Sequence, residues 1–370
     1  MLEWKLIRLG DICITNKNSY SSKDNWKFVN YLDTGSLTEN KITELQYINI
    51  ETDKIPSRAR RKVIKNSILY STVRPNQLHY GIIKEPVDNL LVSTGFTVID
   101  VDINKAIPEF VYYLLTQNNT TEQLQAIAEQ SVSTYPSIKP SDIENLEFKL
   151  PNLIIQNKIV SILDTIDSKI CQNEKINKNL EEQLSALFVN MFGHSIDSLD
   201  NSDIKLGDLI ESVDNRGKTP PLSDEPTDYP IIDVRALSGN SRIIDYTNCT
   251  KYVSKETYNN WFRSGHPKEY DILISTVGSL AEMKIFLGTI GCIAQNVVGF
   301  RTKGISPLYL YQYLNYIKND LVAYNIGSVQ PSIKVTHIIK HSIYVASKED
   351  IEIFDSIARN ITKKIFPNCQ

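Results

Sequence analysis

The chain lacks the cysteine pattern of a disulfide framework or of a zinc ribbon. Its 370 residues contain five cysteines, an odd number, and no two of them form a Cys-x-x-Cys pair. Unpaired cysteines are typical of a reducing compartment, so we expect a cytoplasmic protein. Residues 1–5 show no basic segment followed by an apolar run, and no stretch reaches the roughly 20 apolar residues of a membrane span. We therefore expect neither a signal peptide nor contact with a membrane.

Positive charge is not in excess either. The 40 Lys and Arg residues are outnumbered by 43 Asp and Glu residues, and the formal net charge is −3. A small nucleic-acid-binding domain is usually basic. Any cationic surface for DNA must therefore be local and balanced by acidic residues elsewhere. Hydrophobic residues make up 41% of the chain, enough to form buried cores, and the length predicts two or three domains.

The sequence also lacks a complete catalytic motif. The run Gly-Lys-Thr at 217–219 resembles the end of a phosphate-binding P-loop. However, Ser212 stands where that loop needs its first glycine, and two prolines follow at 220–221 where a helix would run. No Asn/Asp-Pro-Pro-Tyr/Phe box of an amino-methyltransferase is present, and no Gly-rich dinucleotide fingerprint. We therefore expect a protein that is not an enzyme and that binds no cofactor or metal of its own.

Two weaker patterns leave alternatives open. Asp271 followed by Glu282 and Lys284 has the loose spacing of a nuclease in which two carboxylates hold Mg²⁺ and a lysine polarises water. The other interpretation is that Asp271 begins a strand and that Lys284 contacts a DNA phosphate. His337 and His341 are four residues apart, as a metal-binding pair on a helix would be. The segment 332–345 is predicted to form a turn and a strand, which favours ordinary surface histidines.

The chain does contain one internal repeat. Leu-Gly-Asp at 9–11 returns at 206–208, and Ile-Leu-x-Ser-Thr-Val at 68–73 returns at 272–277. Gly-Phe at 95–96, the pair Pro108 and Tyr112, and Pro-Ser-Ile-Lys at 136–139 also return in the same order. Their counterparts are 299–300, Pro307 with Tyr311, and 331–334. The offsets lie between 195 and 204 residues, and the sequence between the matches differs. The two halves are therefore expected to share a fold and to differ in surface.

Each half is predicted to be rich in β-structure. Apolar, β-branched runs at 67–73 and 90–101 indicate strands, and so do their counterparts at 271–277 and 292–301. The segments 108–117 and 307–317 begin with proline and indicate short helices.

Between the halves, residues 152–192 contain no Gly or Pro and predict one long helix that breaks at Gly193. Apolar residues recur every three or four positions along it, which is typical of a helix that pairs with another helix. We expect the following stripe residues to make that contact: Ile155, Ile159, Ile162, Ile166, Leu180, Leu184 and Leu187. A similar stripe begins near Lys348 and ends with the chain at Gln370, so the second helix is expected to be shorter.

Basic, amide and aromatic residues gather in the predicted loops of both halves. Arg can donate two hydrogen bonds to guanine, and Asn or Gln pairs similarly with adenine, whereas many Lys and Arg side chains bind phosphates without reading sequence. The candidate DNA contacts of the first half are Arg58, Arg60, Arg61, Arg74, Asn76, Gln77, Tyr135 and Lys139. Those of the second half are Arg216, Lys218, Thr219, Arg235, Arg263, Lys284, Gln330 and Lys334. The pattern does not separate base contacts from phosphate contacts.

In combination, these motifs resemble the specificity subunits of type I restriction–modification systems. The resemblance covers nearly the whole chain. It rests on the Leu-Gly-Asp start of each half, on 56–60 followed by 68–75, on Arg-Gly-Lys-Thr-Pro-Pro at 216–221, and on Leu-Pro at 150–151 before Gln-x-x-Ile at 156–159. It implies an α+β fold with two tandem β-rich target-recognition domains separated by long antiparallel coiled-coil spacer helices. The implied divisions are a first target-recognition domain at 1–151, a central spacer helix at 152–194, a second target-recognition domain at 195–346 and a short C-terminal spacer helix at 347–370.

The resemblance also implies a DNA-binding subunit without catalysis of its own. Each domain would read one half of a bipartite, asymmetric target in double-stranded DNA. Partner methyltransferase subunits would carry S-adenosylmethionine, and a partner restriction subunit would use ATP and Mg²⁺. The residues do not reveal the target sequence. Two alternatives remain at this stage: a self-contained Mg²⁺-dependent DNA nuclease, and a tandem interaction scaffold that does not bind DNA.

Overall fold

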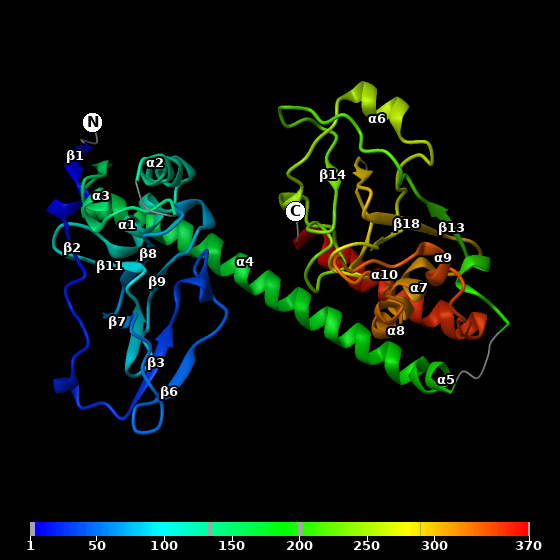
Figure 1. The fold of residues 1–370 in the computed structure, drawn as a ribbon, viewed down its shortest axis with the longest axis horizontal. Coiled ribbons are helices and arrows are strands. Elements are labelled where there is room, and N and C mark those ends of the chain that lie inside the picture. The colour runs from blue at the N-terminus through cyan, green and yellow to red at the C-terminus, as the bar shows by residue number, and fades with distance from the viewer. Residues whose placement is uncertain (1–3, 132–134, 199–202, 289, 369–370) are drawn as a thin grey trace. The chain divides into compact units, whose positions relative to one another are not determined.

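Two compact units make up the chain, residues Met1–Asp167 and Ser168–Gln370. The computed structural model describes residues 4–131, 135–198, 203–288 and 290–368. The division between the units falls inside the long helix α4 (Leu153–Phe188), which belongs to both (Figure 1). The domain limits expected at 151, 194 and 346 therefore stay predictions. The last two residues of the expected C-terminal helix lie outside the described residues.

The first unit combines strands with helices that Figure 1 shows gathered on one side of it. Its strands are β1 (Lys5–Arg8), β2 (Cys13–Thr15), β3 (Phe28–Leu32), β4 (Leu37–Thr38), β5 (Lys41–Ile42), β6 (Gln46–Asn49), β7 (Ala59–Lys62), β8 (Ser67–Ser71), β9 (Tyr80–Ile83), β10 (Leu90–Ser93), β11 (Phe96–Val101) and β12 (Glu147–Leu150). Its helices, apart from α4, are α1 (Pro108–Leu115), α2 (Asn118–Glu129) and α3 (Pro140–Glu144). Short 3₁₀ turns are η1 (Leu9–Asp11), η2 (Ser22–Asp24), η3 (Thr34–Ser36) and η4 (Pro75–Gln77).

The second unit repeats this organisation with fewer strands. They are β13 (Ile210–Val213), β14 (Ile231–Ile232), β15 (Ile272–Ser275), β16 (Met283–Ile285), β17 (Cys292–Ile293) and β18 (Val297–Thr302). Its helices are α5 (His194–Asp197), α6 (Lys255–Trp261), α7 (Pro307–Tyr316), α8 (Lys318–Ala323), α9 (Val335–Ile338) and α10 (Lys348–Asn368). Shorter turns are the π-turn η5 (Val189–Gly193) and the 3₁₀ turns η6 (Leu206–Asp208) and η7 (Tyr246–Asn248).

The central sheet has the same strand order in both units. It runs β2-β11-β8-β9 in the first unit and β13-β18-β15-β16 in the second, and all neighbours are antiparallel. A parallel pair accompanies each sheet, β3 with β10 and β14 with β17. The predicted runs 90–101 and 292–301 therefore each hold two strands separated by a turn. The expectation that the two halves share a fold is confirmed. The expected match of 95–96 with 299–300 is wrong, because Phe96 pairs with Ser71 where Val297 pairs with Ser275, so the counterpart of 95–96 is 296–297.

The middle strands β8 and β15 are buried on both faces. Ile68 faces a core that includes Phe110 of α1, while its neighbour Leu69 faces a separate core. Ile272 and Leu273 divide in the same way between two cores of the second unit. A strand covered on both faces needs apolar residues at every position. This is why both strands stand out in the sequence as continuous apolar runs.

The apolar stripe of α4 packs at its two ends. Ile159 packs partly against the core of the first unit, and Leu184 is buried in the core of the second. Ile155, Leu180 and Leu187 are half-buried. Between them, the side chains of Ile162 and Ile166 are 62% and 50% exposed.

The expected helix break at Gly193 is wrong. The π-turn η5 carries the helical path through Gly193 into α5, which ends at Asp197. Phe192 and Ile196 are both buried, so this continuation belongs to the core of the second unit. A Cβ at position 193 would lie 3.3 Å from the hydroxyl oxygen of Tyr316. The glycine therefore accommodates a close neighbour.

The strand expected within 332–345 is also wrong, because residues Val335–Ile338 form the short helix α9. Val335 and Ile338 are buried three positions apart, which matches one side of a helix. His337 lies on α9, and the Nδ1 atom of His341 lies 2.9 Å from the hydroxyl of Tyr324.

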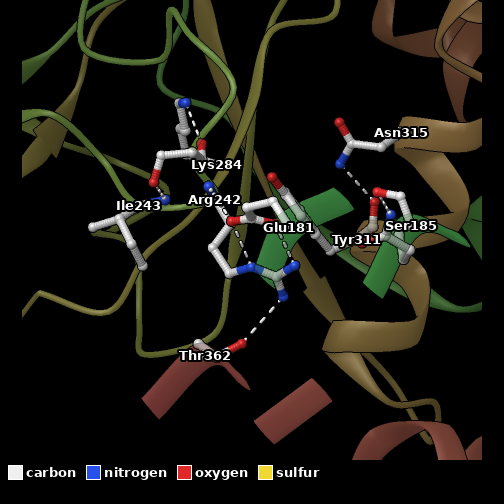
Figure 2. A network of polar contacts seen from close by, with 10 residues as sticks. Glu181, Ser185, Arg242, Ile243, Lys284, Tyr311, Asn315 and Thr362 are labelled. Carbon is white, nitrogen blue, oxygen red and sulfur yellow. Dashed lines mark hydrogen bonds and ion pairs between the residues drawn. The ribbon is translucent and has the colours of Figure 1, made fainter. Parts of the chain in front are cut away.

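A buried ion pair joins α4 to the rest of the second unit. Arg242 is fully buried, and its Nε and Nη2 atoms bond the two carboxylate oxygens of Glu181 on α4 at 2.9 and 2.5 Å. Its Nη1 atom donates to Thr362 of α10 at 3.1 Å, and its guanidinium lies 5.5 Å from the ring centre of Tyr311 on α7. Figure 2 shows how these groups converge. One arginine thus contacts three helices.

We expect Glu181→Gln to lower the free energy of unfolding by about 3 kcal/mol, because it leaves the buried guanidinium without its counter-charge. The matched control is Glu182→Gln. The carboxylate of Glu182 is 66% exposed and 3.9 Å from Lys178, so its loss should cost about 0.5 kcal/mol or less. Urea unfolding of the full chain measures both values. Equal effects of the two substitutions would contradict the role given to the buried pair.

Candidate nucleic-acid interface

Three loops of the first unit meet at one end of its central sheet. Backbone hydrogen bonds join Thr72 N to Gly95 O at 2.8 Å and Ile138 N to Thr72 O at 2.8 Å. Arg74 N also donates to Pro136 O at 2.9 Å. We call these loops the first loop cluster, which consists of 72–78, 94–95 and 135–139.

The first loop cluster brings together five of the predicted residues. The Arg74 guanidinium lies 4.9 Å from the ring centre of Tyr135, a cation–π contact across two loops. Asn76 and Gln77 are exposed on the turn η4, and Lys139 is exposed just before α3. The cluster therefore presents cationic, amide and aromatic groups together. Their contact with DNA stays a prediction.

The basic run at 58–61 borders the first loop cluster. The carbonyl of Arg58 accepts a hydrogen bond from Thr94 N at 2.8 Å, so the run flanks the turn that Thr72 contacts from the other side. Arg58 and Arg60 are exposed, and Arg60 Nε donates to Ser57 O at 3.4 Å. Arg61 is half-buried, and burial lowers its pKa. Arg61 is thus less accessible than its neighbours.

The second unit builds an equivalent cluster with different side chains. Thr276 N donates to Asn296 O at 2.8 Å, and Gly278 N donates to Pro331 O at 3.0 Å. Gln295 Nε2 donates to Thr219 Oγ1 at 2.8 Å, which adds the loop that carries Arg216 and Lys218. Gln330 and Lys334 are exposed in the same set of loops. We call this the second loop cluster, which consists of 216–219, 276–281, 295–296 and 330–334.

A cationic cavity of about 430 Å³ adjoins the second loop cluster. It is lined by Asn215, Arg216, Gly217, Lys218, Asn260, Trp261 and Arg263. Its chemistry combines three cations, two amides and an indole that is 40% exposed. Such a lining suits an anionic ligand with flat rings, as a nucleotide is.

Hydrogen bonds between the two loops of this cavity hold it in shape. Asn215 Oδ1 accepts from Ser264 N at 2.9 Å, and Asn215 Nδ2 donates to Gly265 O at 2.8 Å. Arg263 Nη2 donates to Arg216 O at 2.8 Å. Asp214 holds the Arg216 side chain through Nη2 at 2.6 Å, and this hydrogen bond lowers the pKa of Asp214. The two arginines, Arg216 and Arg263, are therefore positioned before any ligand arrives.

Asn260 and Trp261 were not predicted from the sequence as site residues. They stand at the end of α6, and the available signal was the run Asn-Asn-Trp two residues before Arg263. Nothing in the sequence placed it beside the Arg-Gly-Lys loop, some 45 residues earlier in the chain.

Arg235 stands apart from the cavity lining. It is exposed, and its Nη2 atom bonds Asp233 at 3.1 Å and Thr250 at 2.7 Å. Its assignment as a DNA contact stays a prediction.

The assignment of Lys284 as a DNA contact is wrong for this structure. Its side chain is 1% exposed, and its Nζ atom donates to the carbonyls of Gly239, at 2.7 Å, and Ser241. Burial lowers the pKa of this lysine to about 8. Lys284 thus forms buried hydrogen bonds beside the Arg242 network (Figure 2), and its ammonium group is not accessible to a phosphate.

The three residues of the nuclease alternative are each occupied elsewhere. Asp271 is buried and forms an ion pair with Arg301 at 2.8 Å. Glu282 pairs with Lys318 at 2.9 Å. No group of three or more His, Cys, Asp or Glu side chains that could hold a metal ion occurs among the described residues. The described part of the chain also contains no helix long and apolar enough to cross a membrane.

Two specificity subunits of type I restriction enzymes are similar to this chain in sequence. The chain is 35% identical over 194 residues to the type I restriction enzyme HindI specificity subunit of Haemophilus influenzae, over 52% of this chain and 41% of that relative. The chain therefore spans less than half of that protein's length. It is 23% identical to the type I restriction enzyme MjaIX specificity subunit of Methanocaldococcus jannaschii, over 98% of this chain and 87% of that relative.

A solved structure, the type I restriction-modification system S subunit from M. genitalium, has the same fold at 15% identity. Its TM-score is 0.52, with 99% of this chain and 91% of that chain covered. Residues 1–182 and 199–365 both match the sequence family described as the type I restriction modification DNA specificity domain. The chain is therefore a member of the family of type I restriction modification DNA specificity domains.

Proposed function

We propose that this chain is the sequence-specific DNA-binding specificity subunit of a type I restriction–modification complex. Each unit reads one half of a bipartite, asymmetric target in double-stranded DNA. The subunit has no catalytic site, acts in the cytoplasm and directs partner methyltransferase and restriction subunits. S-adenosylmethionine, ATP and Mg²⁺ are bound by those partners.

One observation carries this proposal. Each unit has a loop cluster at the equivalent end of its own central sheet, and the two clusters present different side chains. The backbone hydrogen bonds Thr72 N to Gly95 O and Thr276 N to Asn296 O are equivalent, because they join matching positions of β8–β11 and β15–β18. The first cluster presents Arg74 and Tyr135, whereas the second presents Lys218 and an adjoining cavity. Equivalent frames with unlike surfaces suit two readers of unlike half-sites.

Contacts inside the second unit support an antiparallel pairing of α4 with α10. The ring centres of Phe188 on α4 and Phe354 on α10 are 5.5 Å apart. Seven residues earlier on α4, Glu181 connects through Arg242 to Thr362, which lies eight residues later on α10. Contacts that lie earlier along one helix and later along the other are typical of antiparallel helices. We propose that this pair forms the spacer of the complex.

The two rival functions are less well supported. A nuclease needs Asp271, Glu282 and Lys284 free to hold Mg²⁺ and water, but each is engaged by a structural partner. A scaffold without DNA contact gives no reason for three cations and an exposed indole around one cavity.

We expect Lys218→Ala to weaken DNA binding through the second half-site alone, because Lys218 is exposed beside the cationic cavity. If it contacts a phosphate, the slope of log K against log salt should fall by about 1. Anisotropy titrations over a salt series would use the assembled complex and duplexes with each half of the target scrambled in turn. The control is Lys255→Ala, an exposed lysine of α6 that does not line the cavity.

Salt-independent binding by the wild-type complex would favour the scaffold function, and DNA cleavage by this chain alone with Mg²⁺ would establish the nuclease. Either result would overturn the proposed function.

We also expect Ile162→Asp and Ile166→Asp to reduce assembly with the methyltransferase subunits at least tenfold while leaving the melting temperature of the chain unchanged. Both side chains are half or more exposed, so they contribute little to folding yet offer apolar surface to a partner. Ile154→Asp is the control, since Ile154 is 68% exposed and lies off the stripe. Co-purification would measure assembly, and equal loss in all three variants would contradict a docking role for the stripe.

A further inference from the structure

Arg74 adopts a backbone conformation that the other unit gives to a glycine. Its φ and ψ angles are 47° and 72°, in the left-handed region. The equivalent residue is Gly278, with φ of 87°. The equivalence follows from the hydrogen bonds of both residues, to Pro136 and Pro331, and from the matching bridges Val73 to Ser137 and Val277 to Ser332.

The left-handed conformation is unfavourable for arginine. For a residue with a Cβ it is disfavoured by roughly 5- to 30-fold relative to the right-handed form, whereas glycine adopts it readily. Space does not dictate the glycine in the second unit, because a Cβ at Gly278 would meet no atom within 4 Å. Strain of this kind clusters at binding and active sites, where the surrounding structure holds it in place.

The geometry of the Arg74 side chain indicates its role. The central carbon of its guanidinium lies 4.9 Å from the ring centre of Tyr135, a cation–π contact that supplies no hydrogen-bond acceptor to the N–H groups. Arg216 and Arg235, by contrast, direct their edges at Asp214 and Asp233. Within the described parts of the chain, Arg74 forms no such ion pair with a carboxylate.

The turn that carries Arg74 is firmly held. Pro75 begins η4, and the N–H groups of Gln77 and Leu78 close it onto Arg74 O and Pro75 O at 2.9 and 3.0 Å. Asn76 N donates to Gln125 of α2 at 3.2 Å. The arginine therefore extends from a rigid support, as precise recognition of a ligand requires.

We propose that Arg74 reads a guanine in the first half-site and that Tyr135 is the positioning residue that holds the guanidinium plane. This inference rests on the proposed function. Arginine can also bind a phosphate through two donors, but a phosphate is the same at every base pair, whereas the O6 and N7 acceptor pair marks guanine. A loss of discrimination at one base pair therefore indicates contact with guanine. A guanidinium that lies over a ring on a hydrogen-bonded turn, and that forms no ion pair within the described residues, supplies such a pair of donors.

The deciding variant is Arg74→Lys, which keeps the charge and the strained backbone but removes the planar fork. We expect it to retain the wild-type salt slope and to lose about 5- to 150-fold discrimination at one G·C pair of the first half-site. Discrimination at the second half-site should be unchanged. Competition titrations with every single base-pair substitution of the target, using the assembled complex, measure both.

Four further variants distinguish base recognition from folding. Arg74→Gly should lose the same discrimination without lowering the melting temperature, because it installs the residue that the second unit uses. Tyr135→Leu should lower discrimination at that base pair and leave the salt slope unchanged, while Tyr135→Phe, which keeps the ring, should discriminate as the wild type does. Lys139→Ala, the control on the same loop cluster, should weaken binding to all duplexes alike.

An Arg74→Lys variant that discriminates as well as the wild type would overturn the assignment to guanine while leaving the proposed function intact. A wild-type complex that binds DNA without any sequence preference would instead overturn the proposed function. Unchanged base discrimination in Tyr135→Leu would show that Tyr135 does not position the Arg74 guanidinium.

Discussion

The central strands β8 and β15 are buried on both faces. The rest of each unit is built around this burial. Every polar backbone group of such a strand needs a partner within the sheet, and every side chain must fit a core. Strand order, register and the points at which the loops leave are therefore fixed together. This explains why both units keep β2-β11-β8-β9 and β13-β18-β15-β16 while the loops differ.

The loops at the end of these sheets could diverge because they are positioned by backbone hydrogen bonds, which place few demands on the side chains. Position 74 is arginine in one unit, and its equivalent at 278 is glycine in the other, yet both make the same bond to the proline opposite. Recognition residues can change on such a frame without changing the fold. The second unit carries its cationic groups on the loop at 216–219 and beside α6 instead. This divergence is the reason for proposing a split target with unlike halves.

Much of this architecture could be predicted from the sequence, since strands buried on both faces and helices with one apolar stripe leave periodic patterns. The site was less predictable. The sequence does not distinguish a lysine that faces solvent from one that, like Lys284, faces the carbonyls of a loop some 40 residues earlier. The left-handed backbone of Arg74 has no signature in the sequence. Gly193 predicted the end of a helix, whereas in the structure this glycine leaves space for the side chain of Tyr316. Each failure reflects a contact between distant residues.

In the function proposed for this protein, one chain combines two different DNA readers. Mapping methylated adenines across the host genome, with this gene present and deleted, tests it most directly. We expect the deletion to remove one methylated motif, made of two short and unlike halves separated by a fixed stretch of unspecified bases. A genome whose methylated motifs are unchanged by the deletion, or a lost motif that is a single palindrome, would contradict it.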